Sequence, residues 1–155
     1  MEVVTHKIIP SQWSKVICSI KNVWKNINIF NIKSKMKNKI NFKKKFNLFS
    51  DYWTPKVIAE MNNYQFKLVK VKGEFISHKH DHTDEAFIVI DGSLKIEFSN
   101  KTINLNSGEM FVVPKGVKHK PYSKEECKIL LVEPRETINT GNVQGKYTAP
   151  NNQWI

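Results

Sequence analysis

Short apolar segments separated by turn residues fill the chain from residue 56 to residue 133. The segment at 94–99 alternates apolar and polar side chains, which is the period of a strand with one buried face. Turn residues such as Asp91-Gly92 interrupt these segments at intervals of roughly 8–12 residues. Many short strands with turns between them are typical of an antiparallel sandwich or barrel. The sequence therefore predicts an all-β domain.

The pattern places the expected strands by their turns. Asn62-Asn63 lies between two such segments, and Asn tolerates the left-handed backbone of a tight hairpin turn. A short helix opened by Thr54-Pro55 is the competing interpretation of residues 55–61. An aromatic lead-in at 46–53 needs covering, either by the domain or by a second subunit. The expected strands are 56–61, 64–72, 87–90, 94–99, 102–105, 109–113 and 128–133.

The basic character of the chain belongs to its first third. The formal net charge is +11, but residues 1–50 contain 11 Lys and one acidic residue, whereas the remainder contains 14 basic and 13 acidic residues. A nucleic-acid-binding domain normally carries a basic face of its own. We therefore expect no specific nucleic-acid partner for the β domain.

Residues 1–38 are expected to be an extension separate from a domain at 39–155. Apolar residues between Trp13 and Ile27 follow the spacing of an amphipathic helix with lysines between them. Such a segment can be a membrane-surface anchor or an organellar transit segment, and a poorly ordered basic leader has the same composition. No apolar run reaches the ~18 residues of a membrane span. Cys18 and Cys127 do not form a disulfide framework, which favours a reducing compartment.

Two turn-flanked stretches carry metal-ligand residue types. His78 and His80 are two residues apart, so on a strand their imidazoles would share a face, and Glu85 could fold back toward them. His119 follows the Pro114-Lys115-Gly116 turn downstream and supplies a fourth ligand. Three imidazoles and one carboxylate suit a first-row divalent ion. The sequence predicts a site for one Fe, Mn, Zn or Ni ion.

These stretches resemble the two motifs of the cupin family. The first motif is matched by Gly73, His78, His80, Glu85 and Gly92, although Gly73 is one residue nearer to the first histidine than in the family pattern. The second is matched by Gly108, Pro114, Gly116 and His119, and Ser123 stands where Asn is expected. The HKHDHTDE stretch and Asn139-Thr140-Gly141 are most like small single-domain cupins of type 2, some of which are labelled mannose-6-phosphate-isomerase-like. The resemblance implies an antiparallel jelly-roll barrel.

Residues near the expected ligands have two interpretations each. His82 is expected at the rim of the site rather than among the ligands. Asp84 could accept a hydrogen bond from a ligand imidazole or cap a backbone N–H in a turn, and the turn is favoured. Glu74, Glu97 and Tyr122 are titratable, but no spacing brings any of them to the metal. No catalytic residue is assigned.

The site and the family resemblance together lead to a functional hypothesis. The expected function is a metal-dependent enzyme of dioxygenase or isomerase type that acts on a small organic molecule. A non-catalytic module that binds a metal or a small ligand is the alternative, because one fold carries many reactions. A homodimer is expected because small barrels commonly cover exposed strand edges with a partner. A cytoplasmic location is expected, with an organellar one as the alternative.

Overall fold

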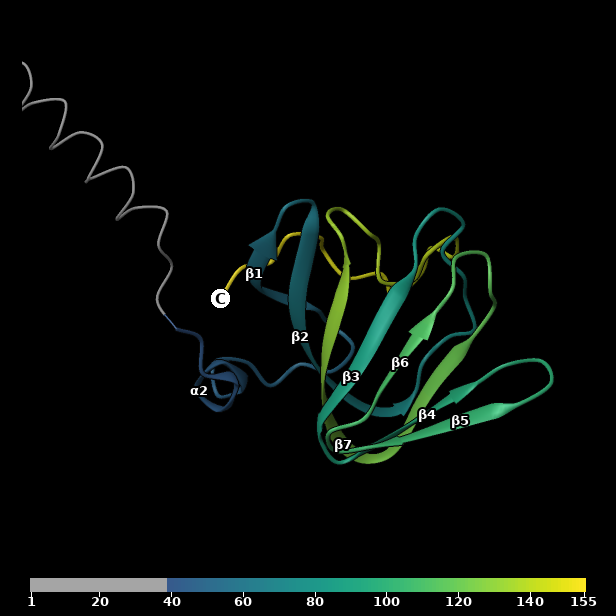
Figure 1. Cartoon of the computed structure of the whole chain (residues 1–155), viewed down its shortest axis with the longest axis horizontal. Coiled ribbons are helices and arrows are strands. Elements are labelled where there is room, and N and C mark those ends of the chain that lie inside the picture. The colour runs from purple at the N-terminus through teal and green to yellow at the C-terminus, as the bar shows by residue number, and fades with distance from the viewer. Residues whose placement is uncertain (1–38) are drawn as a thin grey trace, which may run out of the picture. The chain divides into compact units, whose positions relative to one another are not determined.

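The computed structural model describes residues 39–155, and residues Ile40–Ile155 form one compact unit. The elements of this part are one short helix and seven strands (Figure 1). Expectations for residues 1–38, including the amphipathic segment and Cys18, lie outside the described residues. The elements are α2 (Phe42–Phe46), β1 (Lys56–Met61), β2 (Tyr64–Glu74), β3 (Glu85–Asp91), β4 (Ser93–Glu97), β5 (Thr102–Asn106), β6 (Met110–Val113) and β7 (Lys120–Pro134).

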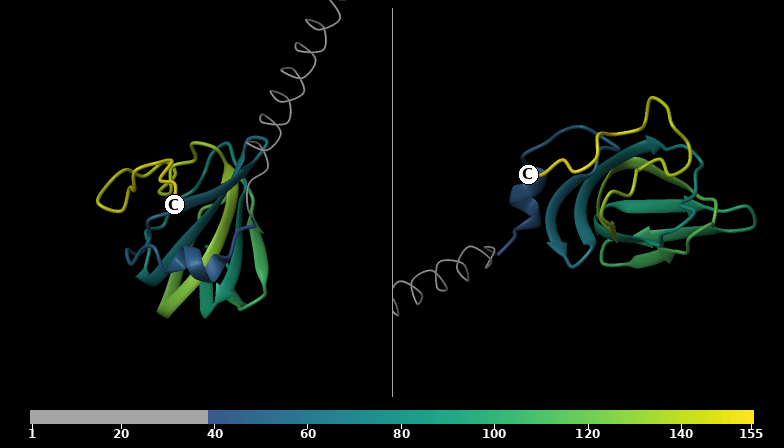
Figure 2. Two further views of the ribbon diagram at one scale, coloured as in Figure 1. Left: turned by 90° about the vertical axis from the view of Figure 1, so that its left-hand side faces the viewer. Right: turned by 90° about the horizontal axis from the view of Figure 1, so that it is seen from above.

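All strand pairs named for this unit are antiparallel, in the order β1-β2-β7-β3-β6, with β4 joined to both β5 and β7. The long strand β7 connects two groups of strands. One edge of β7 pairs with β2 both before and after residues 124–126, whereas its other edge pairs with β4 near Lys120 and with β3 from Lys128 onward. Seen from above, the strands curve round a common interior (Figure 2). The predicted all-β, antiparallel jelly-roll barrel is confirmed.

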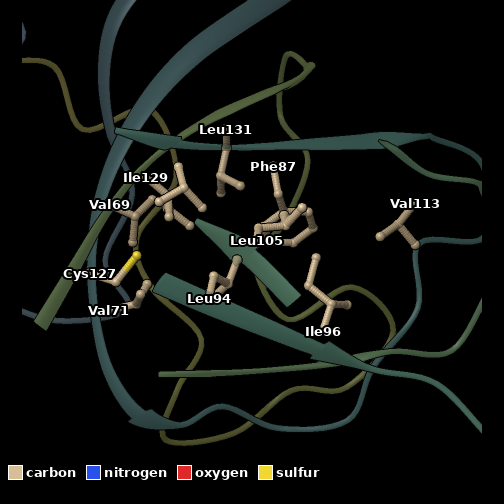
Figure 3. Close-up of a cluster of buried hydrophobic side chains, with 11 residues drawn as sticks. Val69, Val71, Phe87, Leu94, Ile96, Leu105, Val113, Cys127, Ile129 and Leu131 are labelled. Carbon is tan, nitrogen blue, oxygen red and sulfur yellow. The ribbon is translucent and has the colours of Figure 1, made fainter. Parts of the chain in front are cut away.

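The interior is filled by the inward-facing residues of six strands. Along β3 the burial alternates, because successive side chains point to opposite faces of a sheet. β4 alternates in the same way, with Leu94 and Ile96 fully buried and their neighbours exposed. In Figure 3 these side chains meet the inward residues of β2 and β7, including the thiol of Cys127. Cys127 therefore packs within a strand, as expected, and burial raises the pKa of its thiol to about 12.

The outer face of the sheet is also covered in part. Phe46, at the end of α2, is 2% exposed and packs with Ile58, Leu68 and Leu130 in a second cluster. Asn41 caps this helix by accepting a hydrogen bond from the Lys44 N–H at 3.0 Å. The aromatic lead-in thus docks on its own domain, which was one of the two expected solutions.

The structure confirms the predicted first hairpin and differs from expectation at two other places. Residues 56–61 form a strand and not the alternative helix, and Asn62 adopts the left-handed backbone with φ 55°. The last strand begins at Lys120, eight residues before the predicted start. His78 and His80 were expected on a strand, but they lie between β2 and β3. In the segment 75–84, His78 makes an isolated bridge to His119 and no residue belongs to a strand. No helix among the described residues is long and apolar enough to cross a membrane.

Candidate metal centre

The two motif stretches meet through a pair of backbone hydrogen bonds. The His78 N–H donates to the His119 carbonyl at 3.0 Å, and the His119 N–H donates to the His78 carbonyl at 2.9 Å. Gly116, at φ 77°, donates its N–H to the His80 carbonyl at 2.7 Å. A left-handed backbone at this turn is readily adopted by glycine. Two segments about forty residues apart are therefore fixed against each other before any side chain is considered.

The four predicted residues come together inside the barrel. One ligand atom from each of His78, His80, Glu85 and His119 lies within 4.8 Å of the others, and all four residues are buried. Glu85 Oε2 lies 3.2 Å from His119 Nε2 and 3.4 Å from His80 Nε2. Such groups are usually buried only when they are paired or when they coordinate metals. This cluster could hold one metal ion.

The hydrogen bonds of the imidazoles suit metal binding. His78 Nδ1 lies 3.1 Å from the Ile76 carbonyl, and His119 Nδ1 lies 3.0 Å from the Val117 carbonyl. A proton on Nδ1 that is donated to a carbonyl leaves Nε2 as the metal-binding nitrogen. Among the described side chains, Nε2 of both His78 and His80 is buried without a hydrogen-bond partner. These orphaned nitrogens are the observation in this structure that a bound ion would explain.

The cluster also shifts the ionisation of its members. Burial, helped by the charges of His119 and His80, lowers the pKa of His78 to about 4. Burial opposes ionisation of Glu85, but the adjacent imidazoles of His119 and His80, 3.2 and 3.4 Å from Oε2, outweigh it and lower the pKa of this carboxyl. Burial opposes protonation of His80, yet the adjacent carboxylate of Glu85 raises the pKa of this imidazole. The site therefore favours an ionised carboxylate, which is the form that binds a metal.

The other residues considered from the sequence lie outside this cluster. Asp84 accepts a hydrogen bond from the Lys115 N–H at 2.9 Å, so it caps a backbone N–H, which was the favoured interpretation. His82 is exposed and lines a pocket beside His80. Glu74 is exposed and pairs with Lys120 at 2.8 Å. Glu97 and Tyr122 line neither of the two larger pockets that border the cluster.

The pocket beside His80 has a volume of about 310 Å³ and two walls. One wall is the segment 80–83, and the other is the chain that follows β7. Gly141 in that chain, at φ 55°, packs so closely on the Lys79 carbonyl that a Cβ there would collide with it. The Asn142 N–H donates to the same carbonyl at 3.2 Å. The wall is thus hydrogen bonded to the residue between the two motif histidines.

A buried ion pair supports this wall and was not foreseen from the sequence. Lys67 Nζ lies 2.8 Å from Glu133 Oε1, and the two side chains are 3% and 0% exposed. Lys67 also donates to the Thr137 carbonyl at 3.4 Å, at the start of the wall. The signal in the sequence was that Lys67 and Glu133 share the alternation of inward apolar residues such as Val69 and Leu131.

Comparisons with known proteins agree with this site and fold. The family model for the cupin domain, Cupin_2, matches residues 66–133. A cupin-2 domain containing protein from Shewanella frigidimarina NCIMB 400 is 62% identical, with a TM-score of 0.61, over 62% of this chain and 94% of that one. The chain belongs to the cupin family. The four clustered residues lie at or inside the bounds of the family match.

Two further cupin-like relatives carry little functional information. The protein NMB1881 from Neisseria meningitidis is 32% identical with a TM-score of 0.58, over 63% of this chain and 99% of that one. The uncharacterized protein YdbB of Bacillus subtilis is 35% identical over 80 residues, which is 51% of this chain and 71% of YdbB. The cupin match covers residues 66–133, so the aromatic lead-in at 46–53 and the pocket wall at 135–142 lie outside it.

Proposed function

We propose that this cupin is a metal-dependent enzyme that acts on a small organic molecule, of dioxygenase or isomerase type. The observation that supports it most is the buried cluster of four ligand atoms, which borders an open pocket of about 310 Å³. The proposed ligands are His78, His80, Glu85 and His119, and the proposed metal is Fe, Mn, Zn or Ni. A bound ion of this kind supplies Lewis acidity and open coordination positions.

The protein's own residues have three roles in this proposal. The carbonyls of Ile76 and Val117 hold two ligand imidazoles in the tautomer that presents Nε2. Glu85 contributes a negative charge that offsets part of the charge of a divalent ion in a partly closed barrel. The wall at 135–142 borders the pocket that gives a molecule access to the cluster from the His80 side.

We also propose that the protein is a homodimer. We further propose that it is located in the cytoplasm, which is a reducing compartment. Among the strands of residues 39–155, β6 pairs with β3 alone, and its outward residues Met110 and Val112 are 57% and 44% exposed. An exposed apolar edge strand is a surface that proteins commonly cover. The reducing compartment is inferred from Cys127, which is a buried free thiol.

The metal site is tested by elemental analysis of the full chain after reconstitution with each of the four metals. We expect one ion per chain, and loss of that ion in His80→Ala and in His119→Ala. His82→Ala is the matched control, because it removes an exposed imidazole from the same segment and should keep the metal. A chain that takes up no metal under any of these conditions would contradict the proposal.

Catalysis is tested separately on the reconstituted protein. Catechols, β-diketones, thiols and sugar phosphates are offered to the iron and manganese forms. Turnover that is present in the parent chain and lost in His80→Ala would support an enzyme. Stoichiometric metal without turnover of any of these compounds would favour a non-catalytic binding module.

A further inference from the structure

A second, smaller space lies against the metal cluster and shares no lining residue with the pocket beside His80. We call it the inner chamber, and its volume is about 30 Å³. It is bordered by the ligands His78 and Glu85 and by side chains of β2, β3 and β7. Several of these, including Val71 and Ile129, belong to the buried cluster of Figure 3. The inner chamber is therefore part of the barrel interior next to two of the four ligands.

The lining of the inner chamber is mainly apolar, and its polar members are the proposed ligands His78 and Glu85, the indole of Trp53 and Asn139. Asn139 is the one side-chain amide among them, and its hydrogen bonds are made elsewhere. Its amide donates to the Trp53 and Tyr147 carbonyls at 3.2 and 2.9 Å, and its oxygen accepts from the Ala149 N–H at 2.9 Å. A buried water needs roughly 2–4 polar partners, and a cavity of at least about 10–15 Å³ can hold one. The chamber is large enough for a very small molecule but offers water few partners.

Trp53 borders the inner chamber and is held in place by hydrogen bonds and ring contacts. Its backbone N–H donates to the Lys70 carbonyl and its indole N–H to the Lys72 carbonyl, both at 2.9 Å. The indole stacks on Phe75 with ring centroids 4.8 Å apart, and Phe75 meets the His78 ring edge-on at 5.4 Å. Trp53 also has φ 59°, a backbone conformation that bulky residues rarely adopt. The lead-in therefore fixes an aromatic side chain against the chamber.

We propose that the inner chamber binds dioxygen beside the metal cluster, while the organic substrate enters from the pocket next to His80. A chamber of this size admits a diatomic gas or a single methyl group, and an apolar lining favours the gas over water. The proposal rests on the metal-dependent function proposed above, and it selects the dioxygenase type. In that reaction the O–O bond breaks, both oxygen atoms form bonds to the organic substrate, and this substrate is the species oxidised. No further reductant is required.

The experiment measures where dissolved oxygen resides in the full-length, zinc-loaded protein. Zinc is redox-inert and diamagnetic, so any paramagnetic enhancement of methyl relaxation comes from dissolved oxygen and not from the metal. Methyl groups of Val, Leu and Ile are labelled, and their relaxation is recorded with and without pressurised oxygen. Burial of a diatomic apolar molecule favours the chamber over water by roughly tenfold. We expect the enhancement at Val71 and Ile129 to exceed that at Leu68 and Ile58 by at least about threefold.

The comparison methyl groups are as deeply buried as those of the chamber, so burial alone does not explain a difference in relaxation enhancement. Leu68 and Ile58 lie in the outer cluster and are 0% and 6% exposed, and Val71 and Ile129 are 0% and 1% exposed. Equal enhancement in the two clusters would overturn the proposal. Val71→Ile adds one methylene to the chamber and should return Ile129 to the level of the outer cluster, whereas Val132→Ile, in the outer cluster, should leave Ile129 unchanged. An enhancement that survives Val71→Ile would equally overturn it.

This design separates the chamber from the metal site. Zinc uptake is read from the ring signals of the ligand histidines, and oxygen binding is read from methyl relaxation. If none of the four metals binds, the proposed function fails, and the methyl measurement on the metal-free chain still decides whether the chamber takes up oxygen. If zinc binds and the chamber methyls do not respond, the dioxygen site fails and the metal site stands.

Discussion

Replacing Lys67 with methionine removes one half of an ion pair that is buried between β2 and β7. Lys67 Nζ lies 2.8 Å from Glu133 Oε1, and neither side chain is more than 3% exposed. The substitution leaves the carboxylate of Glu133 without its cation. It also removes the donor that reaches the Thr137 carbonyl at the start of the pocket wall.

The expected loss of stability follows from burial and protonation together. Breaking a buried ion pair by removing one partner costs about 3–5 kcal/mol. Burial and the nearby charge of Glu85 raise the pKa of Glu133 to about 7, so this carboxyl can take up a proton once Lys67 is gone. We therefore expect Lys67→Met to lower the free energy of unfolding by about 3 kcal/mol at pH 7.5, which is the lower end of that range. With a urea m-value of about 2 kcal/mol per M, the unfolding midpoint falls by roughly 1.5 M.

The assay is urea unfolding of the full chain followed by circular dichroism. Because the folded pKa of Glu133 is raised above the ordinary value, its neutral form dominates at low pH, so the loss in Lys67→Met should shrink at pH 5. The double variant Lys67→Met with Glu133→Leu removes both charges and should recover to within about 1 kcal/mol of the parent. A loss below about 1 kcal/mol in the single variant, with no recovery in the double variant, would refute this account of a buried pair.

Three shorter predictions concern the wall, the cluster and the edge strand. Gly141→Ala should lower the free energy of unfolding by about 3 kcal/mol or more and weaken zinc binding, because the new Cβ collides with the Lys79 carbonyl. Thermal unfolding and zinc affinity that match those of the parent would contradict this packing. In the metal-free protein the ring of His78 should stay neutral down to about pH 4 in an NMR titration. Its unfolded-state pKa is about 6.5, so the stability it contributes is present above pH 6.5 and lost as the pH falls toward 4, and titration near 6.5 would contradict burial. Met110→Lys on the exposed edge should convert the proposed dimer to a monomer in light scattering, and a monomeric parent would refute the dimer.

Much of the fold could be predicted because its signals are local. The hairpin of β1 and β2 follows from Asn62-Asn63 between two apolar segments, and the structure has the turn there with Asn62 at φ 55°. The alternation along β4 depends only on one wet and one buried face. In these regions the hydrophobic period and the turn residues agree, and such agreement between levels specifies a structure strongly.

The first half of β7 could not be predicted because its signal is non-local. Residues 124–126 are three consecutive exposed charged residues, which is a loop pattern in a single sequence. In the structure β7 changes partner from β4 to β3 on one edge across this stretch, while β2 pairs with the other edge on both sides of it. Ser123, which stands where the family motif has Asn, donates from Oγ to the Ser93 and Glu125 carbonyls at 2.8 and 2.7 Å. The strand persists because its neighbours, not its own pattern, hold it extended.

The four clustered residues were predicted from spacing, but their surroundings were not. His78 and His80 were expected on a strand, whereas the structure holds them in an extended segment fixed by the bridge to His119. A sequence pattern assigns charged residues such as Lys67 and Glu133 to the solvent-exposed face of a strand. A buried pair of opposite charges violates that rule at two positions that face each other only in three dimensions. Local rules tend to fail at such places, next to functional sites.

The division between predicted and unpredicted parts has a consequence for specificity. The cluster lies within the part of the chain that the cupin family model matches, whereas Trp53 and the wall at 135–142 lie outside it. Trp53 borders the inner chamber, and the wall borders the pocket beside His80. A common barrel can therefore hold the same ligands in many proteins while the flanking segments determine what reaches them. Relatives that keep the four ligand residues but differ in these flanks are expected to share a metal site without sharing a substrate.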